Sequence, residues 1–66
     1  MFEVGKFYES NNGDKLLCEK FDERDKTWLF CGGGKHGYIV IWCFANGHLY
    51  DYEYLGPIIK GPWIEK

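Results

Sequence analysis

The sequence predicts a small all-β domain, and three features of the chain support this class. Turn signals recur at short spacing along all 66 residues. β-Branched and aromatic residues fill the segments between them, and no segment carries the apolar stripe of an amphipathic helix. The strongest strand signal is the unbroken apolar run of residues 38–44, which lies between Gly37 and the Asn46-Gly47 turn. We therefore expect a five-stranded antiparallel meander, bent into an SH3-like or OB-like sheet or partly closed barrel, since closure reduces exposed edges.

The expected strands lie between the turns, in chain order at about 2–9, 14–21, 26–31, 37–44 and 47–55. Asn12-Gly13 joins the first pair and Asn46-Gly47 the last pair, and we predict type I′ turns because Asn-Gly readily supplies two positive φ angles. Residues 57–66 are expected to form an extended tail of the single domain 1–66, lying across the sheet or along a neighbouring subunit. Pro57 and Pro62 argue against a central strand there.

The apolar run has two apolar faces. Alternation along a strand separates Tyr38, Val40, Trp42 and Phe44 from Ile39, Ile41 and Cys43. A chain of this length buries only about 60% of the surface of its unfolded form, so covering both faces from within is difficult. A second copy, a partner protein or a ligand is expected to help, which predicts a binding module that forms a homo-oligomer.

The net charge, the cysteine pattern and the length of the apolar segments limit the kinds of partner that the chain is expected to bind. A net charge of −2 and a pI near 5.5 count against binding long DNA or RNA through its phosphates. Three cysteines without a C-x-x-C pair fit reduced thiols better than a secreted disulfide framework. The N-terminus lacks the pattern of a secretory signal, and no apolar segment approaches the roughly 20 residues that span a bilayer. We expect a soluble, cytoplasmic protein with no membrane partner.

An aromatic ladder is the first candidate site. His48, Tyr50, Tyr52 and Tyr54 share one face of the expected last strand, beside Trp42 on its neighbour. Flat rings with a polar tip could stack a nucleobase or grip a Pro-rich peptide. The alternative is that these rings pack a core or a dimer face.

A glycine-rich segment is the second. Consecutive amides of Gly33 and Gly34 could converge on an anion, with Lys35 and His36 adding charge. The segment is no Walker A motif, because His36 stands in place of the hydroxyl residue and a strand is expected to follow, so NTP hydrolysis is not expected. The alternative is a flexible connector. The predicted ligand site is Trp42, Tyr50, Tyr52, Tyr54, Lys35, His36, Gly33 and Gly34.

Metal binding and catalysis find little support. Cys18, Cys31 and Cys43 are 13 and 12 residues apart, without the paired spacing of structural zinc folds. Cys43 with His48 could form a nucleophile and base, but a cysteine among isoleucines is normally inert. Asp51 and Glu53 read as a solvated edge. We expect no enzyme activity, no metal and no cofactor.

Segment 2–8, the Asn12-Gly13-Asp14 turn, Trp28-Leu29-Phe30 and Gly37-Tyr38-Ile39-Val40 together resemble the small single-domain β proteins encoded by bacteriophages and prophages. The resemblance is one of size and strand-turn pattern, and no functional residue is carried over from it. It implies a host-directed protein in the host cytoplasm. Such a protein blocks a host enzyme by contact or, as an oligomer, sequesters nucleotide messengers of host defence.

Two functions follow from these patterns. The first is a homo-oligomer that sequesters a small nucleotide-like ligand between the aromatic face and the glycine-rich anion loop. The alternative is a protein–protein interaction module that inhibits a host protein through the aromatic face.

Overall fold

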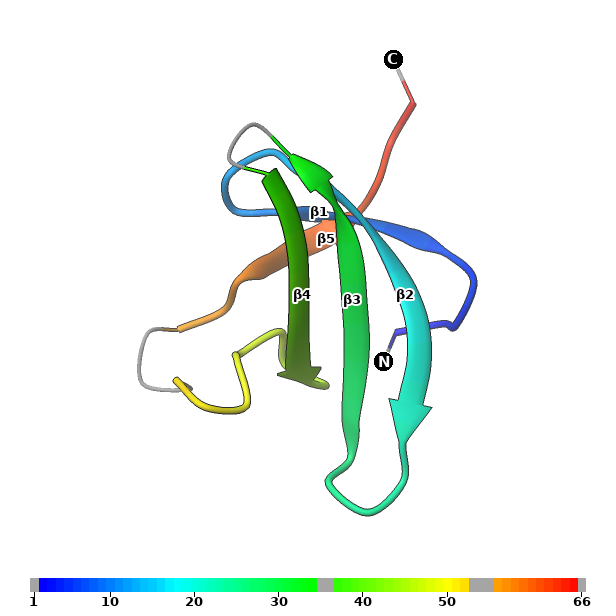
Figure 1. The fold of residues 1–66 in the computed structure, drawn as a ribbon, viewed down its shortest axis with the longest axis vertical. Coiled ribbons are helices and arrows are strands. Elements are labelled where there is room, and N and C mark those ends of the chain that lie inside the picture. The colour runs from blue at the N-terminus through cyan, green and yellow to red at the C-terminus, as the bar shows by residue number, and fades with distance from the viewer. Residues whose placement is uncertain (1, 35–36, 53–55, 66) are drawn as a thin grey trace.

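The computed structural model describes residues 2–34, 37–52 and 56–65, and it confirms the all-β class. Its strands are β1 (Phe7–Ser10), β2 (Lys15–Asp22), β3 (Thr27–Gly34), β4 (Gly37–Phe44) and β5 (Ile59–Pro62). They form one antiparallel sheet in the order β4-β3-β2-β1-β5 (Figure 1). Within the described ranges no helix is present.

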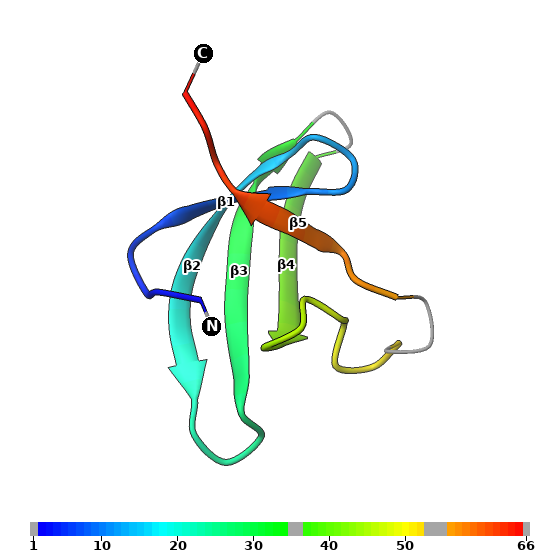
Figure 2. The ribbon, with the colours of Figure 1, turned by 180° about the vertical axis from the view of Figure 1, so that it is seen from behind.

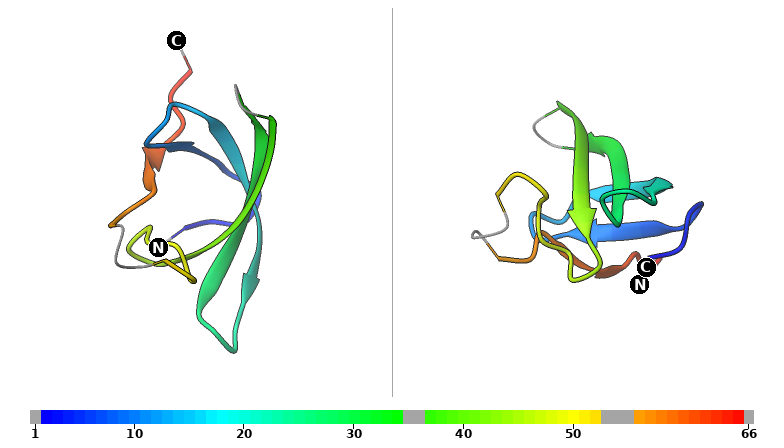
Figure 3. Two further views of the ribbon diagram at one scale, coloured as in Figure 1. Left: turned by 60° about the vertical axis from the view of Figure 1, so that its left-hand side comes forward. Right: turned by 90° about the horizontal axis from the view of Figure 1, so that it is seen from below.

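The sheet is strongly curled. Strands β2, β3 and β4 form one side, and β1 and β5 cross behind them, as the view from the back makes clear (Figure 2). An extra residue, Glu19, interrupts the register between β2 and β3, and such a bulge increases the local bend and twist. Figure 3 shows the resulting two-sided shape, in which the sheet folds over itself without closing into a barrel.

The core lies between the two sides of this curl. It contains Tyr8 from β1, Leu16 and Cys18 from β2, Trp28 and Phe30 from β3, Cys43 from β4 and Ile59 from β5. Phe2 closes it, with ring centroids 5.0 Å from Tyr8, 5.6 Å from Trp28 and 4.9 Å from Phe30, all edge-to-face. The inner side of the sheet is therefore covered by the chain itself.

The two Asn-Gly turns exist, but the type I′ prediction is wrong for both. In each, only the glycine has a positive φ, 87° at Gly13 and 84° at Gly47. The Gly47 N–H donates to Phe44 C=O and the Phe44 N–H to His48 C=O, each at 2.9 Å. This pattern is a three-residue loop that ends in a left-handed glycine, a common hairpin alternative. Gly13 closes the loop between β1 and β2 in the same way.

The fifth strand differs from the prediction. Residues 48 and 49 make only isolated bridges, to Pro57 and Cys43, so no strand covers 47–55 among the residues described there. The predicted tail supplies β5 instead, which pairs with β1 at one edge of the sheet. Pro62 is compatible with this place because an edge strand needs only half of its N–H groups for pairing. The N–H of Ile58 donates to Gly47 C=O at 2.8 Å, which brings the two sheet edges together at one end.

Candidate functional site

Strand β4 separates a buried side from an exposed one, as its alternation predicts. Ile39, Ile41 and Cys43 pack against or within the core. On the opposite side Tyr38 is 73% exposed and Val40 is 58% exposed. We call this side of β2–β4, which faces away from β1 and β5, the outer face; its members are Leu17, Glu19, Lys20, Leu29, Cys31, Tyr38, Val40 and Trp42.

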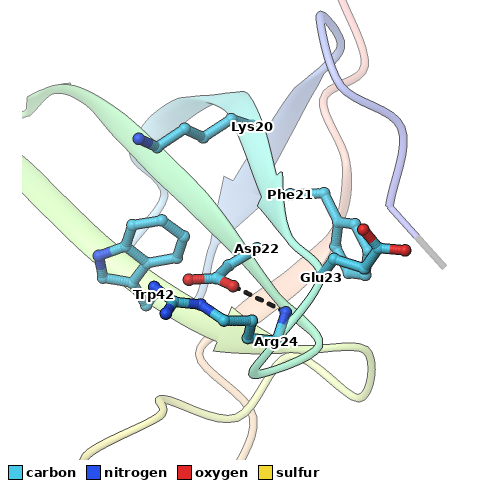
Figure 4. Close-up of a pocket in the computed structure, with 6 residues that line it drawn as sticks. All are labelled: Lys20, Phe21, Asp22, Glu23, Arg24 and Trp42. Carbon is cyan, nitrogen blue, oxygen red and sulfur yellow. Dashed lines mark hydrogen bonds between the residues drawn. The ribbon is translucent and has the colours of Figure 1, made fainter.

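Trp42, near the C-terminal end of the edge strand β4, borders two hollows on the outer face. The first, of about 290 Å³, is lined by Lys20, Phe21, Asp22, Glu23, Arg24 and Trp42. The Lys20 Nζ lies 5.7 Å from the centre of the Trp42 ring, within cation–π range. Figure 4 shows Lys20 and Arg24 reaching toward the indole from two sides, while the Asp22 carboxylate accepts a 2.9 Å hydrogen bond from the Arg24 backbone N–H. The lining of this hollow therefore combines the Trp42 indole with two cationic and two acidic side chains.

The second hollow lies at the edge of β4. It measures about 220 Å³ and is lined by Val40, Ile41, Trp42, Leu49, Asp51 and Tyr52. Two predicted site residues, Trp42 and Tyr52, thus share a cavity. Tyr50 instead packs edge-to-face on Phe44, with 5.5 Å between ring centroids. The predicted ladder does not form along a strand, because the chain leaves the edge of β4 after Tyr50.

The glycine-rich segment is not the loop that the sequence predicts. Gly32, Gly33 and Gly34 belong to β3 and pair with Ile39, Tyr38 and Gly37. None of the three has a positive φ, which an anion-binding nest requires in alternation. This removes the support for phosphate binding by these amides. Lys35, His36 and Tyr54 lie outside the described residues.

A polar cluster that the sequence did not reveal lies on the outer face. The Cys31 thiol donates to Glu19 Oε2 at 2.7 Å, and this hydrogen bond raises the pKa of Cys31. The Tyr38 hydroxyl is hydrogen-bonded to the same thiol, which raises the pKa of Tyr38. A thiol with a raised pKa is a poor nucleophile at neutral pH. The cluster depends on the bulge at Glu19, for which the sequence carries no visible signal.

The other two cysteines are on the inner side. Burial raises the pKa of Cys18 to about 11 and that of Cys43 to about 12. Neither thiol is therefore activated, and both lie on the opposite side of the sheet from Cys31. Among the residues described, no group of three or more His, Cys, Asp and Glu side chains is placed to hold a metal ion.

A third hollow, of about 590 Å³, lies at the C-terminal segment and is lined by Glu9, Gly13, Trp63, Ile64 and Glu65. Beside it, Lys15 Nζ lies 4.5 Å from the Phe7 ring centre, 5.6 Å from that of Trp63 and 3.2 Å from Glu65 Oε1. These contacts tie the C-terminal segment to β1 and β2. Because Lys15 already holds the acid and both rings, this hollow is a weaker candidate than the outer face.

Comparison with protein-family models, with curated proteins and with solved structures finds no match to this chain. The described part of the chain contains no helix that could cross a membrane.

Proposed function

We propose that the protein is a non-enzymatic binding module that contacts a partner protein through the outer face. The observation that carries this proposal is the exposure of Tyr38 and Val40 on a strand whose other side is buried. Most of the apolar surface of these two side chains is left in water, where it contributes no burial energy to the folded chain. Contact with a partner would remove them from water.

The composition of the outer face supports a protein partner. Tyr and Trp are enriched among residues that dominate binding energy, and here Tyr38 and Trp42 lie on one strand. Charged side chains of Glu19, Lys20 and Arg24 surround them, as a polar rim surrounds an interface centre. The resemblance to phage-encoded β proteins adds a host protein as the expected partner.

Co-purification from the cells in which the chain is native tests this proposal. The double variant Tyr38→Ser/Val40→Thr should lose a stoichiometric partner, with affinity lower by about tenfold or more. The matched control is Ile64→Thr, which alters an apolar side chain with the same 73% exposure away from the outer face. Equal partner recovery with both variants would contradict the proposal.

A nucleotide-like ligand is the second candidate, and the first hollow favours it. Trp42 offers a stacking surface worth about 1–3 kcal/mol per base. Lys20 and Arg24 could contact phosphate, in place of the glycine amides that the sequence suggested. A thermal-shift screen with mono-, di- and cyclic nucleotides tests this candidate. A shift that is lost in Trp42→Leu supports it, and no shift with any nucleotide removes it.

A further inference from the structure

Strand β4 has an open edge beside the outer face. The Phe44 N–H donates to His48 C=O, and the Tyr50 N–H donates to Trp42 C=O, each at 2.9 Å. Backbone groups of alternate residues in an antiparallel strand point to the same edge. The N–H and C=O groups of Tyr38 and Val40 therefore point away from β3, as those of Trp42 and Phe44 do. No strand in the described part of the chain pairs with them.

The open edge lacks the usual protection against pairing. Edge strands are commonly blocked by a charged side chain, a proline, a bulge or a very short length. Strand β4 has eight residues, Gly37–Phe44, none of them charged and none of them proline. Its register with β3 is uninterrupted from end to end. The edge is thus a ready template for another extended segment.

The second hollow opens where this edge becomes free. Residues 48–50 run antiparallel beside β4 and then leave it, and Asp51 follows directly. Among the described residues that line the hollow, Asp51 is the one that carries a charge. An acid beside the rings of Trp42 and Tyr52 suits a Lys or Arg side chain, because the rings attract a cation and the carboxylate pairs with it.

We propose that the β4 edge binds an extended basic segment of a partner protein. The segment pairs with β4 as an antiparallel strand beside Tyr38 and Val40, where residues 48–50 no longer occupy the edge. Its Lys or Arg side chain enters the second hollow, next to Asp51. Recognition of this kind gains affinity from backbone hydrogen bonds and specificity from side-chain pockets. The proposal rests on the proposed function, since it names the chemistry of the protein partner.

A second copy of the chain fits the edge less well. Strand β4 itself carries no positive charge, so pairing of two β4 strands brings no cation from the strand to Asp51. Residues 48–50 also occupy the edge at Trp42 and Phe44 in each copy, which limits the overlap to Gly37–Ile41. A basic partner segment is limited to the same stretch of this edge, but it brings the cation that a second β4 lacks.

Blocked seven-residue peptides of alternating Thr and Val, with Arg, Leu or Glu at the central position, provide the probe. Binding is followed by amide chemical shifts and hydrogen exchange of the full chain. We expect the Arg peptide to bind about threefold more tightly than the Leu peptide and to slow exchange of the Tyr38 and Val40 amides. The Glu peptide should bind most weakly. Methylating the peptide amides that face β4 should remove binding without any change to the protein.

Variants then separate the hollow from the edge. Asp51→Asn should abolish the preference for Arg over Leu, whereas Asp25→Asn, which alters an exposed acid in the β2–β3 turn, should leave it intact. Val40→Pro should weaken all the peptides about threefold or more, because it removes an edge donor that no described residue uses.

Three outcomes overturn the inference. One is an absence of binding by every peptide, and another is binding that leaves exchange at Tyr38 and Val40 unchanged. The third is concentration-dependent protection of these amides without peptide, which assigns the edge to a second copy. If a partner is still lost in Tyr38→Ser/Val40→Thr under these outcomes, the proposed function stands while strand addition fails.

Discussion

Two adjacent glycines in β3 provide a sharp test of how the sheet is packed. Gly32 lies close to the start of β2: a Cβ there would be 2.5 Å from the Lys15 carbonyl oxygen and 3.1 Å from Leu16 Cδ2. A Cβ on Gly33 would meet nothing within 4 Å. Neither residue has a positive φ, so backbone strain does not distinguish them. The substitutions Gly32→Ala and Gly33→Ala therefore differ in packing alone.

The expected magnitudes follow from these distances. A carbon–oxygen contact is normally about 3.3 Å or longer, so β2 would have to move by roughly 0.8 Å to admit a methyl group at Gly32. Overpacking of this kind costs about 1–3 kcal/mol. Ala at Gly33 meets no obstacle and reduces the freedom of the unfolded chain, a gain of about 0.4–1 kcal/mol. The same gain applies to Gly32→Ala and cancels in the comparison, so the two variants should differ by the overpacking cost of about 1–3 kcal/mol, with Gly33→Ala the more stable.

Urea unfolding followed by tryptophan fluorescence measures this difference directly. Both variants should keep the wild-type m-value, because the surface exposed on unfolding is unchanged. For a domain of this size, 1 kcal/mol corresponds to a shift in Tm of about 4–8 °C, which gives a second readout. Variants that agree within about 0.5 kcal/mol would refute the close approach of β2 to Gly32.

Three further predictions concern the core, the thiols and the outer face. Phe2→Ala should lower the free energy of unfolding by about 2 kcal/mol, measured in urea, because it removes the ring that closes the core. Folding raises the pKa of Cys18 to about 11 and of Cys43 to about 12 from an ordinary 9.0, so above pH 9.0 the unfolded chain loses protons that the folded chain retains. Stability should therefore fall as the pH rises from about 9 to about 12, and less steeply in Cys18→Ala/Cys43→Ala; equal slopes would count against the buried thiols. Light scattering coupled to gel filtration tests the predicted homo-oligomer: its mass should exceed that of one chain and should be the same in Tyr38→Ser/Val40→Thr, because the outer face is the proposed site of the partner protein, and a wild-type protein that stays monomeric at high concentration would contradict it.

The all-β class and the first four strands could be predicted because turn residues bound each of them. The faces of β4 were also predictable, since alternation fixes which side chains lie together once a strand is recognised. The ends of β3 were not. In sequence, Gly32–Gly34 resemble a loop. In the structure, Gly32 is needed because the backbone of β2 lies too close to leave room for a Cβ. That contact joins segments distant in the chain, so the local sequence does not encode it.

The fifth strand illustrates a second limit. Alternating rings in residues 48–54 indicate that this segment could form a strand, but pairing also requires a free edge and a chain path that follows it. Among the described residues of this segment, 48–50 follow β4, whereas Ile59–Pro62 reaches the edge of β1 on the other side of the sheet. The second hollow results from this departure. Leu49 and Asp51 could not have been assigned to it without knowing where the chain leaves β4.

The way the chain covers its own core also limits the kind of complex that it can form. Phe2, β1 and β5 cover the inner side, so the apolar surface of β4 left for a partner is that of Tyr38, Val40 and Trp42. Obligate interfaces usually bury more than about 2,000 Å² of largely apolar surface, which this small face with its charged rim does not offer. A partner held here should therefore exchange, with backbone pairing along β4 contributing as much as the side chains. For that reason edge substitutions such as Val40→Pro should shorten the lifetime of the complex more than they slow its formation, because association among variants of one interface changes little.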